Sequence, residues 1–185
     1  MDTWMWIVLA ILVVLAVAAI AYAFVVRQRS TKLQERFGPE YDRRVESADS
    51  RREAEAELRD VQERREHIEI TPLPESSRRR YGSEWEAIQR QFVERPVTAV
   101  AAADDLIVAV MAERGYPVGQ FDEQADLVSA DFPEVAGRYR SAHAVREKSS
   151  DATTEDLRQA FVHYRALFDE MLEHDQDARR EGNRR

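Results

Sequence analysis

The sequence predicts an all-α protein with an N-terminal transmembrane helix, a charged helical stalk and a compact C-terminal bundle of four to five helices. Three observations carry this prediction. Residues 4–26 carry no charge, apolar residues recur at three- and four-residue intervals in the C-terminal half, and no segment longer than a short connector alternates with the period of a strand. The 185 residues include no cysteine, which excludes disulfide scaffolds, thiolate zinc sites and cysteine nucleophiles.

A short tail, residues 1–3, precedes the apolar run at residues 4–26. A helix of this length spans about 34 Å, enough for the roughly 30 Å hydrocarbon core of a bilayer. Aromatic residues stand at both ends of the run, as in an aromatic belt: Trp4, Trp6, Tyr22 and Phe24. Membrane lipid is therefore an expected partner. The alternative is a signal peptide cleaved after Ala23, but no Lys or Arg precedes the run and the run is longer than usual for a signal peptide.

The flanks of the apolar run predict its orientation. Asp2 lies before it, and four basic residues follow it closely: Arg27, Arg29, Lys32 and Arg36. The positive-inside rule then places the N-terminus outside and the C-terminal domain in the cytoplasm of a single-pass membrane protein. Ala19 and Ala23 form a small-xxx-small pair, which leaves a weak homodimer open.

Residues 27–74 read as a charged helical stalk with a proline-containing connector. Residues 27–80 hold 14 basic and 13 acidic side chains, with pairs such as Glu55 and Arg59 at the favourable i,i+4 spacing. Apolar positions are sparse, so a solvated spacer helix is favoured over a short coiled coil. Gly38-Pro39 breaks any helix that continues from the membrane. The connector Ile68–Pro74 is extended and either spans a gap or lies against the following domain.

Residues 75–175 predict an acidic helical domain. Apolar stripes at helical spacing indicate helices at Tyr81–Phe92, Pro96–Arg114, Asp122–Ser129, Asp131–Val145 and Thr153–Met171. Gly115 is the expected stop of the second helix, and Asp131 and Thr153 are the expected N-caps of the last two. Residues 176–185 are polar and are expected to form a disordered tail.

Catalytic motifs are missing from the sequence. It contains no GxxxxGK[ST], GxGxxG or GxSxG pattern, and its four histidines form no metal-binding pair. The acidic doublets Asp104-Asp105 and Asp169-Glu170 are typical of solvent-facing helix surfaces. Residues 81–175 carry 9 basic and 19 acidic side chains, which argues against nucleic-acid binding. We therefore expect no enzyme, no catalytic or metal-ligating residue and no cofactor.

The favoured hypothesis is a single-pass membrane protein whose acidic domain serves protein–protein interaction or scaffolding with an unknown protein partner. The candidate interaction surface is the turn with Arg114, Tyr116 and Pro117, although packing of Tyr116 on its own domain is the stronger expectation. One alternative is a membrane-anchored enzyme or small-ligand binder that uses carboxylates between helices, assisted by His143 or His163. The other is a cleaved, secreted helical protein.

A set of residues at fixed spacing also resembles a known family. The residues are Arg80-Tyr81, Trp85, Gln89, Phe92-Val93, Ala103-Asp104, Val110-Met111, Arg114-Gly115-Tyr116-Pro117, Asp131-Phe132-Pro133-Glu134-Val135, Tyr139-Arg140, Ala142-His143, Thr154-Glu155-Asp156-Leu157-Arg158 and His163-Tyr164-Arg165. The pattern, within residues 27–173, resembles bacterial, chiefly actinobacterial, membrane-anchored proteins often labelled hypothetical or secreted. The resemblance implies an anchor followed by a helical domain, and it brings no catalytic residue, substrate or cofactor.

Overall fold

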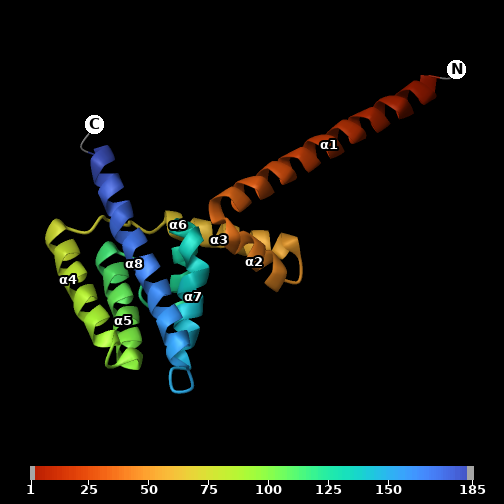
Figure 1. The fold of residues 1–185 in the computed structure, drawn as a ribbon. Helices are drawn as coiled ribbons and strands as arrows, with labels where there is room; N and C mark the ends of the chain where they lie inside the picture. The colour runs from red at the N-terminus through yellow and green to blue at the C-terminus, as the bar shows by residue number, and fades with distance from the viewer. Residues whose placement is uncertain (1–2, 183–185) are drawn as a thin grey trace.

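The computed structural model describes the backbone of residues 3–182, and residues 1–2 and 183–185 lie outside the described part of the chain. The side chains of residues 174–182 and of many residues before Ser30 lie outside it as well. Over residues 3–182 the chain forms α-helices and no strand, which confirms the predicted all-α class. Figure 1 shows one long N-terminal helix that leads into a folded helical body.

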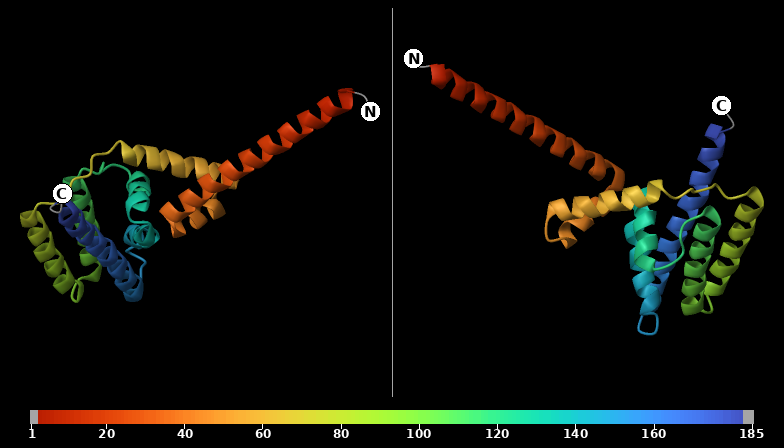
Figure 2. Two further views of the ribbon diagram at one scale, coloured as in Figure 1. Left: turned by 90° about the horizontal axis from the view of Figure 1, so that it is seen from above. Right: turned by 180° about the vertical axis from the view of Figure 1, so that it is seen from behind.

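Helix α1 (Thr3–Phe37) contains the apolar run at residues 4–26 and projects away from the body (Figure 2). Eight of its described large apolar side chains are more than half exposed: Trp4, Leu12, Val13, Val14, Leu15, Val17, Ile20 and Phe24. Among the residues that the structure describes, no helix combines the length and the apolar character needed to cross a membrane. That description leaves out a large part of the predicted transmembrane segment, namely the side chains of residues 5–11, 19, 22, 23, 25 and 26.

The chain turns sharply where α1 ends. Gly38 has φ 45° and ψ −125°, a left-handed backbone that favours glycine, and Pro39 then occupies the first turn of α2 (Pro39–Ser47). The predicted break at Gly38-Pro39 is confirmed. Because of this turn, α2 lies against the end of α1, where Phe37 is fully buried.

Helix α3 (Arg51–Glu66) begins at Ser50, whose hydroxyl accepts a hydrogen bond from the Glu53 amide. It differs from the predicted solvated spacer, because its sparse apolar stripe is buried. The stripe helps to form a second apolar cluster, made of Leu33, Phe37, Tyr41, Leu58, Val61 and Ala130. Ala130 belongs to α6, so α3 is docked on the helical body. The apolar stripe of α3, which could have formed a short coiled coil with a second chain, is covered by residues of the same chain.

The connector after α3 also lies on the body, which is the second of its two predicted arrangements. Leu73 is buried, and Ile68 and Ile70 pack against the main core. The Thr71 amide donates a hydrogen bond to the Arg114 carbonyl at 2.9 Å. Gly115 permits this close approach, since a Cβ there would lie 2.7 Å from the Glu69 carbonyl oxygen, and its φ of 98° also favours glycine.

Five further helices form the body: α4 (Glu75–Phe92), α5 (Pro96–Arg114), α6 (Phe121–Asp131), α7 (Pro133–Glu147) and α8 (Thr154–Gly182). Helix α5 packs on α4, α7 and α8, and α7 also packs on α6 and α8. The predicted stripes face one core. In it the ring of Trp85 stacks on Phe161 and Phe168, with ring centroids 5.1 and 4.9 Å apart. The bundle expected in this region is therefore present.

Two expected helix ends are confirmed and two are corrected. Gly115 ends α5, and Thr153 and Asp156 form a reciprocal capping box at the start of α8. Asp131 is wrong as an N-cap: α7 starts after Phe132 with no side-chain cap, and Asp131 binds groups on other elements. The disordered tail is wrong for residues 176–182, where α8 continues to Gly182. This segment is rich in Arg, Gln, Glu and Ala, which favour helix.

The docking of α3 predicts a large effect of the substitution Leu58→Ala. Leu58 is 1% exposed, so its truncation leaves a cavity and should lower the free energy of unfolding by about 2–5 kcal/mol. Chemical denaturation of the full chain in detergent, followed by circular dichroism, measures the loss. Arg59→Ala, at an exposed position on the same helix, is the matched control and should change stability by less than about 0.5 kcal/mol. Equal small effects would mean that α3 is a solvated spacer.

Candidate functional site

The turn predicted as an interaction surface is mostly buried. Arg114 is 2% exposed and Tyr116 is 3% exposed, whereas Pro117 is exposed. The Arg114 guanidinium lies over the rings of Tyr116 and Phe132, at 5.8 and 5.6 Å from their centroids. Packing of Tyr116 on its own domain, the stronger of the two expectations, is therefore what the structure shows. Arg114 and Tyr116 cannot meet a partner without unfolding of this turn.

Tyr116 forms part of an internal polar contact between three elements. Its hydroxyl donates a hydrogen bond to Asp131 at the end of α6, and Arg65 of α3 donates to the same carboxylate oxygen at 2.5 Å. Arg65 also donates to the Ile68 carbonyl. The partly buried Asp131 carboxylate thus joins α6 to α3 and to the α5–α6 turn, and Arg65 extends the contact to the connector.

A second polar network joins α2 to α6 and α7. Asp126 accepts hydrogen bonds from Arg44 and from Arg140, the latter at 2.8 Å. Glu40, which is 3% exposed, accepts from Arg43 at 2.7 Å and lies 3.5 Å from Arg140. Each of these side chains has an oppositely charged neighbour within the chain, so the network fixes how α2 sits on the body.

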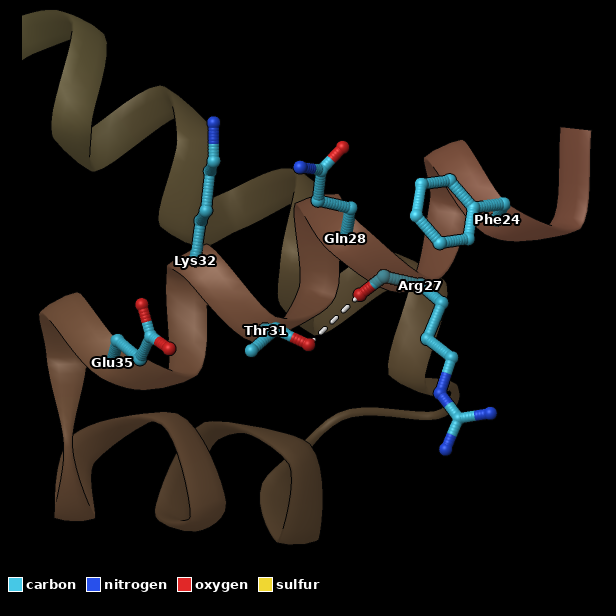
Figure 3. Close-up of a pocket in the computed structure, with 6 residues that line it drawn as sticks. All are labelled: Phe24, Arg27, Gln28, Thr31, Lys32 and Glu35. Carbon is cyan, nitrogen blue, oxygen red and sulfur yellow. Dashed lines mark hydrogen bonds between the residues drawn. The ribbon is translucent and has the colours of Figure 1, made fainter. Parts of the chain in front are cut away.

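The surface of α1 carries a shallow pocket of about 360 Å³ (Figure 3). One helix supplies every residue that lines it: Phe24, Arg27, Gln28, Thr31, Lys32 and Glu35. In Figure 3 the side chains of Arg27 and Lys32 point in opposite directions. Their charges do not converge, and the one hydrogen bond drawn is an intrahelical contact from Thr31 to the Arg27 carbonyl. This pocket has no geometry for binding a ligand.

A pocket of about 370 Å³ on the body brings more chemistry together. It lies between α5, α6 and α7 and the turn that follows α5. Its lining residues are Asp104, Asp105, Val108, Val118, Gly119, Phe121, Gln124, Tyr139, His143 and Arg146. The ligand-binder alternative required a concave polar pocket near a histidine, and His143 lines this one.

Asp104 is the central polar residue of that pocket. It is 4% exposed, and Arg146 Nε lies 3.0 Å from its Oδ2 atom. His143 Nδ1 lies 3.6 Å from the other oxygen, Oδ1, beyond normal hydrogen-bond distance. The His143 ring is held flat on Phe121, with centroids 3.5 Å apart and planes at 4°. The helix packing therefore fixes the imidazole beside the buried Asp104 carboxylate.

Two tyrosines complete the surroundings of Asp104. Burial raises the pKa of Tyr139 and of Tyr164 above the usual value of 10, and the nearby Asp104 carboxylate raises both further. Both phenols are therefore neutral at physiological pH. The expectation that the acidic doublet faces solvent is correct for Asp105, which is 74% exposed at its side chain, and wrong for Asp104.

The other candidate groups do not assemble. Within the described residues no cluster of three His, Cys, Asp or Glu side chains has metal-binding geometry. Asp169 forms an exposed ion pair with Arg165 on α8. His163 is half-buried, and burial and the Arg138 charge lower its pKa. The side chain of His174 lies outside the described residues.

Sequence reasoning missed Arg146 as the ion-pair partner of Asp104 and Tyr139 as its neighbour in the pocket. A signal for Asp104 was present, because it lies four residues after Val100 and three before Ile107, on the buried stripe of α5. The partners come from α7, more than thirty residues later in the chain.

No protein-family model, curated protein or solved structure matches the chain. The resemblance to bacterial membrane-anchored proteins stays a prediction.

The buried phenols predict a delayed alkaline titration. Burial and the Glu113 carboxylate raise the pKa of Tyr81 to about 12, and burial raises those of Tyr41, Tyr116, Tyr139 and Tyr164. An unfolded chain ionises its phenols near pH 10, whereas the folded chain keeps them neutral to higher pH. The stability that these buried phenols contribute is therefore fully present below pH 10, and it is lost as the pH rises above 10. Spectrophotometric titration should show these five phenols ionising only above pH 10, and near pH 10 in denaturant. Full ionisation near pH 10 with the helical signal intact would contradict the packing.

Proposed function

We propose that the protein is a membrane-anchored scaffold, in which residues 4–26 insert into a bilayer and hold the α2–α8 body at the membrane surface. The carrying observation is the position of α1, whose apolar part projects beyond the body. The large apolar side chains described within residues 4–26 are more than half exposed, among them Val14 at 66% and Ile20 at 70%. Exposed apolar surface on this scale is costly in water and favourable in lipid.

The charges beside the apolar run support an orientation with the body in the cytoplasm. Arg27 and Lys32 lie on the exposed surface of α1 just beyond the run, within reach of anionic headgroups. This would place the N-terminus outside. The same basic side chains explain why the pocket on α1 lacks a convergent geometry: they are spread around the helix, as interfacial anchors are.

The body then serves as an interaction surface for a protein partner. Residues 81–175 carry ten more acidic than basic side chains, and most acidic side chains of α4 and α8 that are described are exposed. An acidic surface favours a partner with a basic surface and repels the phosphates of nucleic acid. Because Arg114 and Tyr116 are buried, we propose the exposed acidic faces of the bundle, and not that turn, as the contact region.

Docking of α2 and α3 makes the connection between anchor and body short. The last turns of α1 are part of the second apolar cluster through Leu33 and Phe37. A scaffold built this way holds its body at a defined position relative to the bilayer, whereas a solvated stalk would allow the body many positions and orientations. This supports scaffolding over a simple tether.

Charge insertion into α1 tests the anchor. Full-length protein expressed in a bacterial host should stay in the membrane fraction after an alkaline wash. The double substitution Leu12→Arg and Leu15→Arg should release it, since each arginine near the centre of a span costs about 2.5–3.5 kcal/mol. The matched control is Val93→Arg with Val97→Arg, at exposed valines at the end of α4 and in the first turn of α5, which should remain membrane-bound.

Wild-type protein in the soluble fraction, or a double α1 variant that stays with the membrane, would contradict the anchor.

A single cysteine at the exposed Arg158, in a chain that has no other, reports the orientation of the body on intact cells. Labelling by an impermeant maleimide before permeabilisation would contradict a cytoplasmic body. Mild cross-linking before extraction tests the scaffold role, which fails if only the protein itself is recovered.

A further inference from the structure

Helix α3 begins close to the end of the apolar run in α1. The buried side chain of Ser30 in α1 contacts the Glu55 carboxylate in the first turns of α3. Ser30 lies only four residues after Val26, the last residue of the run, which is about 6 Å along the helix axis. Leu33 of α1 and Leu58 of α3 also share the second apolar cluster. The first turns of α3 are therefore level with the part of α1 that directly follows the run.

The α2–α3 turn, residues 47–50, reaches further in the same direction. Helix α2 runs back beside the end of α1, and α3 then starts on the side toward which α1 projects, as Figure 1 and both views of Figure 2 show. The interfacial layer of a bilayer is about 5–7 Å thick on each side of the hydrocarbon core. With residues 4–26 in the core, the turn and the start of α3 lie at the level of the lipid headgroups.

Side chains of both charges surround this turn. Residues 46–53 carry three acidic and two basic side chains, all of them exposed: Glu46, Asp49, Glu53, Arg51 and Arg52. Arg52 forms no ion pair within the part of the chain that the structure describes. A uniformly anionic lipid layer would repel the three carboxylates. A zwitterionic headgroup instead offers a phosphate to a guanidinium and an ammonium group to a carboxylate.

We propose that the α2–α3 turn is a second membrane contact, which lies among zwitterionic phospholipid headgroups with the Arg52 guanidinium on a lipid phosphate. A guanidinium donates charge-assisted hydrogen bonds to phosphate oxygens in a matching fork geometry. The inference rests on the proposed anchor, because it takes residues 4–26 as the bilayer span. The body then touches the membrane at α1 and at the turn, and these two contacts fix its orientation toward a partner.

Relaxation of spin labels tests the position of the turn. The full chain is reconstituted in phosphatidylcholine vesicles with a small fraction of a lipid that has a nickel-chelating headgroup, which speeds the relaxation of labels in the headgroup layer. A label at the exposed Ser47→Cys should relax faster when this lipid is present. The control label at the exposed Ser150→Cys, in the turn between α7 and α8, should show no enhancement. A third label at Ala21→Cys reports on the anchor, and dissolved oxygen should relax it more than a water-soluble nickel complex does.

Thermal unfolding of two matched variants tests the phosphate contact. Arg52→Gln should lower the melting temperature by about 2–4 °C more in phosphatidylcholine vesicles than in a maltoside detergent, which has no phosphate. Arg59→Gln is the control, because Arg59 is also exposed and lies seven residues further along α3, two turns from Arg52 and away from the bilayer. It should shift the melting temperature equally in vesicles and in detergent.

Three results would overturn the inference. The first is a Ser47 label that relaxes no faster than the Ser150 label while the Ala21 label lies in lipid. The second is an enhancement at Ser47 that appears only in phosphatidylglycerol vesicles, which would assign the contact to anionic lipid. The third is an equal response of Arg52→Gln and Arg59→Gln to the change from vesicles to detergent. An Ala21 label that lies in water would contradict the anchor itself, and with it this contact.

Discussion

The burial of Phe37 at the end of α1 is the contact on which the rest of the architecture depends. Phe37 is fully buried, and the left-handed Gly38 immediately after it turns the chain so that α2 returns along α1. Only then can α3 place Leu58 and Val61 over the same site and bring the second apolar cluster against Ala130 of α6. Without this contact, α1 would be joined to the body by a charged, mobile stalk.

Apolar burial and ion pairing contribute differently to this junction. Each fully buried Phe or Leu side chain contributes about 1.5–3 kcal/mol, whereas a solvent-exposed ion pair contributes at most about 1 kcal/mol. The stability of the junction therefore comes mainly from Phe37, Leu58 and their neighbours. The partly buried contacts at Asp126 and Asp131 fix the register of α2 and α3, because removing one partner leaves a desolvated charge.

Local sequence signals predicted local structure well. The capping box of Thr153 and Asp156, the stop at Gly115 and the break at Gly38 each depend on residues within a few positions, and all are present. Long-range partners were not predictable in this way. Asp131 resembles an N-cap in its local context, but Arg65 lies 66 residues away in the sequence and takes its carboxylate. A stripe of apolar residues likewise indicates that a face of α3 is buried without indicating what covers it.

The same limit applies to the candidate site. The position of Asp104 on an apolar stripe of α5 could have identified a buried carboxylate. Its meeting with Tyr139 and His143 depends on how α7 packs on α5, which no local pattern encodes. The all-α class and the helices of the body followed from periodicity. The docked arrangement of α2 and α3 and the pocket followed only from tertiary packing.

Helix α1 and the body form one unit, and a distance distribution between them tests this arrangement most directly. The chain has no native cysteine, so spin labels at Gln28→Cys on α1 and Arg90→Cys on α4, both exposed positions, report on the junction alone. Pulsed electron–electron double resonance on the protein in nanodiscs should give a single narrow distance distribution. It should be as narrow as that of a control pair of labels within the body, at Arg90 and Arg158. A broad distribution for the first pair beside a narrow one for the control would contradict the docked junction.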